Sequence, residues 1–334
     1  MASRRIRRGL LLALKIAVSA SLIALVATRV NLTEYGTVLS KISPGVVATV
    51  LAIIVVQMAI ISAYRLKFLL ALLSCRISVF RTSCVTWSGF FSEQIGAIFV
   101  TGDLVRIWLL RQAGVNSVAA IEGPLLDRII GFGCLALLAT VGFPSLWLRL
   151  SENQREIMIS CAAVLVLLPL AVLVAARARL NSPKALASLY AAIQSAIGTL
   201  ARRSSHGTLA RVAMLAMMTH GLNIVAIYFL LGGVGAQVSF AHCFYFIPTV
   251  LFVSNIPVSI SGWGIREAAM LVALHNFNVE PAGIIMASVL FGTCAIVASL
   301  PGALIWLSVP NRHESAESTG EARLAASPLQ IDSR

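Results

Sequence analysis

Long apolar runs that contain almost no charged residues recur along this 334-residue chain. A helix needs about 20 consecutive apolar residues to cross the hydrocarbon core of a bilayer. Runs close to that length predict six full transmembrane helices, at residues 9–28, 46–63, 129–148, 157–176, 212–232 and 283–307.

Two further apolar regions are broken. Residues 66–101 are interrupted by Arg76 and Arg81 and carry Glu93, and residues 240–276 contain two prolines and two glycines. Irregular backbone is tolerated at membrane depth only where it is buried in protein or lines a wet cavity. We therefore predict two re-entrant hairpins that enter from opposite sides and enclose a central site. The alternative is eight plain spans.

The distribution of basic residues favours the hairpins. The segment 177–211 and the N-terminus are both rich in Arg and Lys, and cytoplasmic segments carry an excess of these residues. If residues 83–101 formed a simple span, four spans would precede the run at 157–176, and the basic segment would lie outside. With two hairpins, the basic segment and both termini are cytoplasmic.

Composition supports a membrane protein. Hydrophobic residues make up 58% of the chain and charged residues only 12%, against about 25% charged in soluble domains. We predict an all-α polytopic protein with an integral membrane domain over residues 1–310, including a cytoplasmic amphipathic helix at 181–206, and a disordered polar cytoplasmic tail at 311–334. The net charge of +13 comes mostly from residues beside apolar segments, which indicates anionic lipid headgroups and no nucleic-acid partner.

Charged residues within the apolar sequence are the first candidate site. An intramembrane charge costs roughly 2.5–3.5 kcal/mol on insertion scales, so it needs a partner or a wet cavity. Glu93 is flanked by apolar residues, and Asp103 is spaced to pair with Arg106 one turn later, with Gly102 permitting a break before them. This pair also suits a capped interfacial helix without a ligand.

Asp127 and Arg128 stand at the mouth of a predicted span. Arg128 alone would serve as a topology anchor, so Asp127 indicates an ion pair with another buried group, such as Arg106.

The stretch from Asn255 to Glu267 is the second candidate site. Pro257 would end a helix, and the serines and glycines after it would leave backbone amides free. A helix N-terminus beside an arginine suits a phosphate group. The candidate residues are Ser259, Ser261, Gly262, Gly264, Arg266 and Glu267. An extramembrane loop with an interfacial tryptophan is the alternative.

Common catalytic and cofactor motifs do not occur in the sequence. It contains no Walker A, HExxH, GxSxG or Rossmann pattern, and its cysteines and histidines lack metal-ligand spacing. We therefore expect no cofactor, no metal and no enzymatic activity.

Three motifs resemble the lysylphosphatidylglycerol synthase transmembrane-region family, also called flippase-like, over roughly residues 10–308. They are Gly102-Asp103-x-x-Arg106, Asp127-Arg128 and Pro257-x-Ser259-x-Ser261-Gly262-x-Gly264-x-Arg266-Glu267. The chain has Val100-Thr101-Gly102 before Asp103, where many relatives have a Pro-Gly pair before the aspartate. The resemblance implies a stand-alone member in a bacterial inner membrane, without the aminoacyl-transferase domain of the multidomain relatives.

The resemblance also implies the translocation of a lipid between leaflets. The cargo would be an anionic phospholipid, a hopanoid, a glycolipid or a polyprenyl-linked molecule, with a separate lipid-modifying enzyme as a further partner. Three arginines would hold an anionic headgroup and four carboxylates would balance charge: Arg106, Arg128 and Arg266, with Glu93, Asp103, Asp127 and Glu267. The alternatives are a non-catalytic subunit of a lipid-modifying or glycan-modifying complex, and a membrane lipid transferase.

Overall fold

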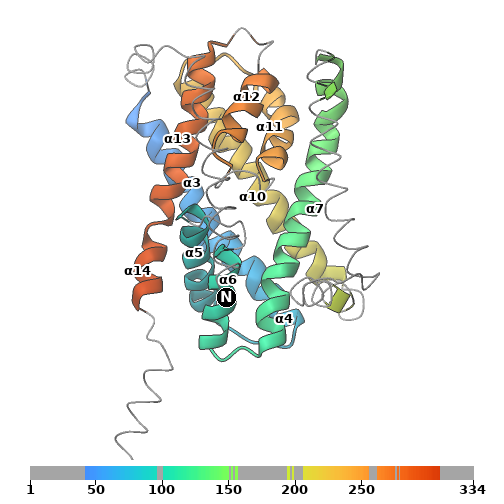
Figure 1. Cartoon of the computed structure of the whole chain (residues 1–334), viewed down its shortest axis with the longest axis vertical. Helices are drawn as coiled ribbons and strands as arrows, with labels where there is room; N and C mark the ends of the chain where they lie inside the picture. Colours follow the sequence, from blue (N-terminus) through green and yellow to red (C-terminus); the bar gives the residue numbers. More distant parts are fainter. Residues whose placement is uncertain are drawn as a thin grey trace, which may run out of the picture.

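The computed structural model describes five main stretches of the chain: residues 42–95, 101–149, 206–255, 262–274 and 279–308. Every regular element in these stretches is helical, which confirms the predicted all-α class (Figure 1). Several predicted features lie outside the described residues: the spans at 9–28 and 157–176, most of the amphipathic helix at 181–206, and the tail at 311–334.

Long helices form the frame of the bundle. The first is continuous from Pro44 to Leu72 and consists of α3 (Pro44–Val56), a π-helical turn η1 (Gln57–Ile61) and α4 (Ser62–Leu72). The others are α7 (Ser117–Arg149), α10 (His206–Gly233), and α13 (Pro281–Ser299) followed by α14 (Pro301–Ser308).

Four helical stretches among the described residues are long and apolar enough to cross a membrane: Pro44–Leu72, Ser117–Val141, Gly207–Gly233 and Pro281–Ser308. They contain the core of the spans predicted at 46–63, 129–148, 212–232 and 283–307. The first two helices extend well beyond their predicted ends at 63 and 129. Arg65 and Asp127, which lie just beyond those predicted ends, are buried as a pair and do not stop a helix.

Two pairs of short helices lie between the long ones. The first pair is α5 (Val79–Ile95, 17 residues) and α6 (Thr101–Gln112, 12 residues). The second is α11 (Phe240–Ser254, 15 residues) and α12 (Ile265–Leu274, 10 residues). Each helix is shorter than the roughly 20 residues of a span.

The two pairs occupy opposite halves of the molecule, with α5 and α6 in the lower half of Figure 1 and α11 and α12 in the upper half. This arrangement agrees with the prediction of opposed hairpins. The predicted boundary of the first hairpin was wrong, because α4 continues to Leu72 and the pair occupies residues 79–112, not 66–101. The second pair fits the predicted range of 240–276.

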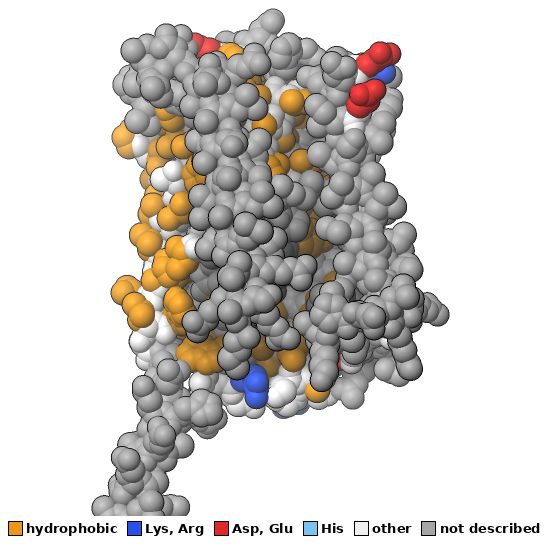
Figure 2. Space-filling view, viewed as in Figure 1, with side chains coloured by type: hydrophobic (Ala, Val, Ile, Leu, Met, Phe, Trp, Pro, Cys, Tyr) orange, Lys and Arg blue, Asp and Glu red, His pale blue; other side chains and the backbone are white. Residues whose placement is uncertain are grey.

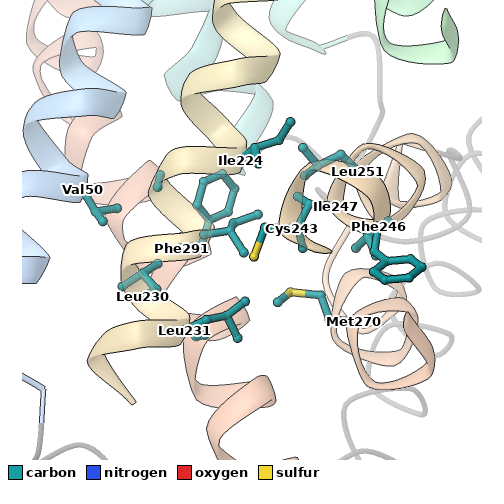
Figure 3. Packing of buried hydrophobic residues seen from close by; sticks show 14 of the residues in the cluster. Val50, Ile224, Leu230, Leu231, Cys243, Phe246, Ile247, Leu251, Met270 and Phe291 are labelled. Atoms are coloured by element: carbon teal, nitrogen blue, oxygen red, sulfur yellow. The ribbon is translucent and has the colours of Figure 1, made fainter. Parts of the chain in front are cut away.

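The largest apolar core fixes the second pair in place. Phe246 and Ile247 of α11 and Met270 of α12 are almost completely buried. They pack with Leu230 and Leu231 of α10 and with residues of α3 and α13 (Figure 3). The position of α11 between α7 and α10 therefore follows from side-chain packing.

On the face shown in Figure 2, the described side chains along the middle are mostly hydrophobic, and the charged ones that are visible lie near the two ends. Large side chains such as Phe80 and Leu307 are 78% and 79% exposed, as expected for residues that face lipid. The end that contains the α4–α5 and α6–α7 connections carries exposed Arg76, Arg81, Arg111 and Arg211. The opposite end carries exposed Glu152, Glu156 and Glu280.

Candidate functional site

Four charged side chains from three helices form a closed set, here called the charge ring: Glu93 of α5, Asp103 and Arg106 of α6, and Arg128 of α7. Arg128 Nη2 donates to Glu93 Oε1 at 2.9 Å, and Arg128 Nε donates to Asp103 Oδ2. Arg106 Nη1 donates to Asp103 Oδ1 at 3.2 Å, and Arg106 Nη2 lies 3.8 Å from Glu93 Oε2. Each carboxylate thus contacts both arginines, and the ring has no net charge. The predicted Asp103–Arg106 pair is confirmed.

Two glycines bring α5 and α6 close enough to form the ring. A Cβ atom on Gly102 would lie 2.6 Å from the carbonyl oxygen of Gly89, and one on Gly89 would lie 2.3 Å from Arg106 Nε. The Arg106 guanidinium also lies 4.7 Å from the centre of the Phe90 ring. Gly102 is therefore needed for close packing inside the first turn of α6, whereas the sequence suggested a break in the chain.

Asp127 forms a separate buried pair. Arg65 of α4 donates to it through two nitrogens, Nε to Oδ1, and Nη2 to Oδ2 at 2.8 Å. An ion pair was predicted for Asp127, but the suggested partner, Arg106, was wrong. Successive residues of a helix point about 100° apart, so Asp127 faces α4 while Arg128 faces the ring. Arg65 was missed because it follows an apolar run and resembles a basic flank.

A cavity of about 210 Å³ lies against these charges. Its charged lining comprises Glu93, Arg106 and Arg128 of the ring, together with Arg65 and Asp127. Its neutral polar lining comprises Ser62, Thr219, His220, Asn223 and Asn255. Glu93 and Arg106 of the ring belong to the first helix pair, whereas Leu251 and the C-cap residue Asn255 belong to the end of α11 in the second pair. The cavity therefore lies where the two opposed pairs meet.

Apart from Asn255, which opens the second candidate stretch, the neutral lining was not predicted, because it depends on how α10 and α4 pack. Gln57 Nε2 donates to the Thr219 carbonyl oxygen at 2.6 Å and to Asn223 Oδ1 at 3.0 Å, which fixes this part of α10. His220 Nε2 contacts the Gly131 carbonyl oxygen at 3.0 Å, and the residue also lines the cavity.

The second candidate stretch is divided: Asn255 at its start lines the cavity, whereas Gly264, Arg266 and Glu267 do not and have partners of their own. Glu267 Oε2 accepts from the Gly264 amide at 2.6 Å, which resembles half of a capping box at the start of α12. Glu267 Oε1 accepts from Ser288 Oγ at 2.6 Å and from Arg266 Nη2 at 3.1 Å. Arg266 Nε donates to Ser288 Oγ at 2.9 Å. These bonds attach α12 to α13.

Two glycines and two aromatic rings beside Arg266 and Glu267 fit the same packed arrangement. Gly262 and Gly264 have φ values of 76° and 85°, which favour glycine at both positions. The Arg266 guanidinium lies 5.3 Å and 5.5 Å from the ring centres of Trp263 and Phe291. Ser259 and Ser261 lie outside the described residues. The described part of the motif is thus built as a packed ion pair.

Long apolar helices, an apolar exterior and a buried charged cavity define a polytopic α-helical membrane protein. The chain matches the model of the family described as "Lysylphosphatidylglycerol synthase TM region" over residues 12–302. It belongs to that family, as its motifs indicated, and so to a group of membrane proteins of lipid metabolism or transport. A search of curated proteins found no match.

Proposed function

We propose that this protein moves an anionic lipid or lipid-linked molecule between the leaflets of a bacterial inner membrane. The observation that carries the proposal is the charge ring beside a cavity at the meeting point of the two helix pairs. Drug-sized ligands occupy pockets of about 300–1,000 Å³. A cavity of about 210 Å³ suits a headgroup, while the acyl chains stay in the bilayer.

The chemistry of the ring supports an anionic headgroup. Guanidinium groups bind phosphate through paired hydrogen bonds. Arg106 makes only one hydrogen bond within the ring, at 3.2 Å, while its Nε has no hydrogen-bond partner among the described residues. Arg106 is therefore less fully engaged than Arg65, which makes two bonds to Asp127. Arg106 and Arg128 are the proposed headgroup ligands, and no chemical step on the lipid is required.

The charges at the two ends of the molecule indicate how the protein is oriented in the membrane. The arginine-bearing end would be cytoplasmic under the positive-inside rule. The α5–α6 pair then enters from the cytoplasm, the α11–α12 pair enters from outside, and α14 ends on the cytoplasmic side (Figure 1). We propose, as the sequence predicted, that the N- and C-termini also lie on the cytoplasmic side of the inner membrane.

A flipping assay in proteoliposomes tests the function. Acyl-labelled fluorescent phosphatidylglycerol is the probe, and back-extraction into albumin measures its movement. Wild-type protein should speed movement over protein-free liposomes, and Arg128→Gln should lower the rate at least tenfold. Arg111→Gln is the matched control, because Arg111 is exposed on α6 and lies outside the cavity lining.

Either of two results would contradict the proposal. One is a wild-type rate equal to that of protein-free liposomes. The other is an unchanged rate in folded Arg128→Gln protein.

A further inference from the structure

An anionic headgroup that binds Arg128 through Nη2 competes with Glu93, which accepts from the same nitrogen at 2.9 Å. Arg128 is held by Glu93 at 2.9 Å and by Asp103, and Arg106 is shared between the same two acids. When a phosphate takes these arginines, at least one carboxylate loses its cation and stands beside a second anion. A second anion close by disfavours the charged form of a carboxylate, so proton uptake by that carboxylate relieves the repulsion.

Glu93 is the carboxylate placed to be displaced. Its side chain is 25% exposed, against 11% for Asp103. Glu93 also lines the cavity, whereas Asp103 is not among the lining residues. Its contact with Arg106, at 3.8 Å, is the longest in the ring. Glu93 can therefore give way to a ligand while Asp103 keeps Arg106 and Arg128 in position.

Other titratable groups near Glu93 have partners. From α6 it faces Asp103 and Arg106, and from α7 it faces Arg128. Asp127 of α7 is engaged by Arg65 of α4. His220 of α10 also lines the cavity and contacts the Gly131 carbonyl oxygen. His220 is thus another ionisable group in the cavity. The test must therefore separate the effect of His220 from that of Glu93.

We propose that Glu93 binds a proton when a singly charged phosphodiester headgroup binds, so that proton and headgroup cross together. This inference rests on the proposed function. In the empty protein, Glu93 is paired with Arg128, and the two acids and two arginines of the ring balance. In the loaded protein, one phosphodiester anion and one proton are added, and the site is neutral again. Both states avoid an uncompensated charge at membrane depth.

Coupling of the headgroup to a proton predicts the direction in which a pH gradient moves the lipid. Proton binding on the acidic side favours headgroup binding on that side, so a pH gradient drives the lipid away from the acidic compartment. With one proton per headgroup, a gradient of one pH unit supports at most about a tenfold ratio between leaflets.

The experiment measures this ratio in proteoliposomes with acyl-labelled fluorescent phosphatidylglycerol, with and without a gradient of about one pH unit. Wild-type protein should enrich the probe several-fold in the leaflet away from the acid. Glu93→Gln should equalise the probe regardless of the gradient, because its amide cannot take up the proton. His220→Gln should keep the gradient-dependent ratio, whatever its absolute rate.

The outcomes separate the two proposals. Fast wild-type flipping with equal leaflets under a gradient overturns proton coupling and leaves the proposed function standing. Wild-type protein that flips no faster than protein-free liposomes overturns the proposed function itself. Loss of the ratio in His220→Gln but not in Glu93→Gln overturns the assignment to Glu93.

A second measurement does not depend on the folding of a variant. Short-chain phosphatidylglycerol is added to wild-type protein in weakly buffered detergent that contains a pH indicator. About one proton should be taken up for each headgroup bound. Binding without proton uptake overturns the proposal.

Discussion

The charged residues inside the helix bundle are of two kinds, those that face the cavity and those enclosed by hydrogen-bond donors. Only their surroundings distinguish the two kinds. Glu93 faces a cavity, whereas Glu267 is 3% exposed and is surrounded by donors from Gly264, Arg266 and Ser288. Sequence spacing correctly predicted the Asp103–Arg106 pair, because i and i+3 residues lie on one face of a helix. Spacing gives no information on contacts between distant helices, so Arg65 was not predicted.

Glu267→Gln tests this distinction. The sequence alone suggested that Glu267 contributes to the headgroup site, but its bonds favour a structural role. Its loss would leave Arg266 buried without a counter-charge, which costs about 3–5 kcal/mol. We expect a clearly lower Tm and yield in detergent, with transport falling in proportion to folded protein.

Glu280→Gln is the matched control, because Glu280 is exposed and makes no side-chain cap bond at the start of α13. Its Tm should equal that of the wild type. A Glu267→Gln protein with wild-type Tm but no transport would contradict the structural role and support a role of Glu267 in headgroup binding.

At the scale of elements, α5 is held on two sides by side-chain bonds to backbone carbonyls. Ser83 Oγ donates to the Ala59 carbonyl oxygen at 2.7 Å, within the π-helical turn η1. Trp87 Nε1 donates to the Ala298 carbonyl oxygen at 2.7 Å, and Ser88 Oγ donates to that of Gly302 at 3.1 Å. A π-helical turn has no clear sequence signature, so this attachment was not predicted. The helix that carries Glu93 is thereby fixed.

Gly302→Ala should disrupt the attachment. A Cβ atom there would lie 2.3 Å from the Trp87 carbonyl oxygen, and that backbone cannot move without displacing α5. We expect a lower Tm and slower transport. Gly221→Ala is the control, because nothing lies within 4 Å of its Cβ position and alanine favours a helix. Equal Tm values for the two variants would contradict the tight contact.

At the scale of the whole molecule, the long apolar runs and the positive-inside rule predicted the class and the opposed helix pairs. The boundaries were less accurate, because neutralised charges such as Arg65 and Asp127 remain inside helices. Boundary prediction from charge therefore fails where charges pair across helices.

Cysteine labelling tests the orientation in a variant without native cysteines. Ser74→Cys lies in the α4–α5 connection and Gln237→Cys in the α10–α11 connection, and both positions are exposed. A membrane-impermeant maleimide added to intact cells should label Gln237→Cys, and should label Ser74→Cys only after permeabilisation. Labelling of both from one side would contradict the opposed pairs.

The two helix pairs contribute unequally to the cavity. The first pair supplies Glu93 and Arg106, whereas the α11 residues that reach it, Leu251 and Asn255, carry no charge. Among the residues that the structure describes, withdrawal of α11 would break no ion pair at the cavity and would mainly expose apolar surface. Exposure of apolar surface to water raises the heat capacity. The free energy of opening toward the α11 side should therefore have a curved dependence on temperature. It should change little with ionic strength.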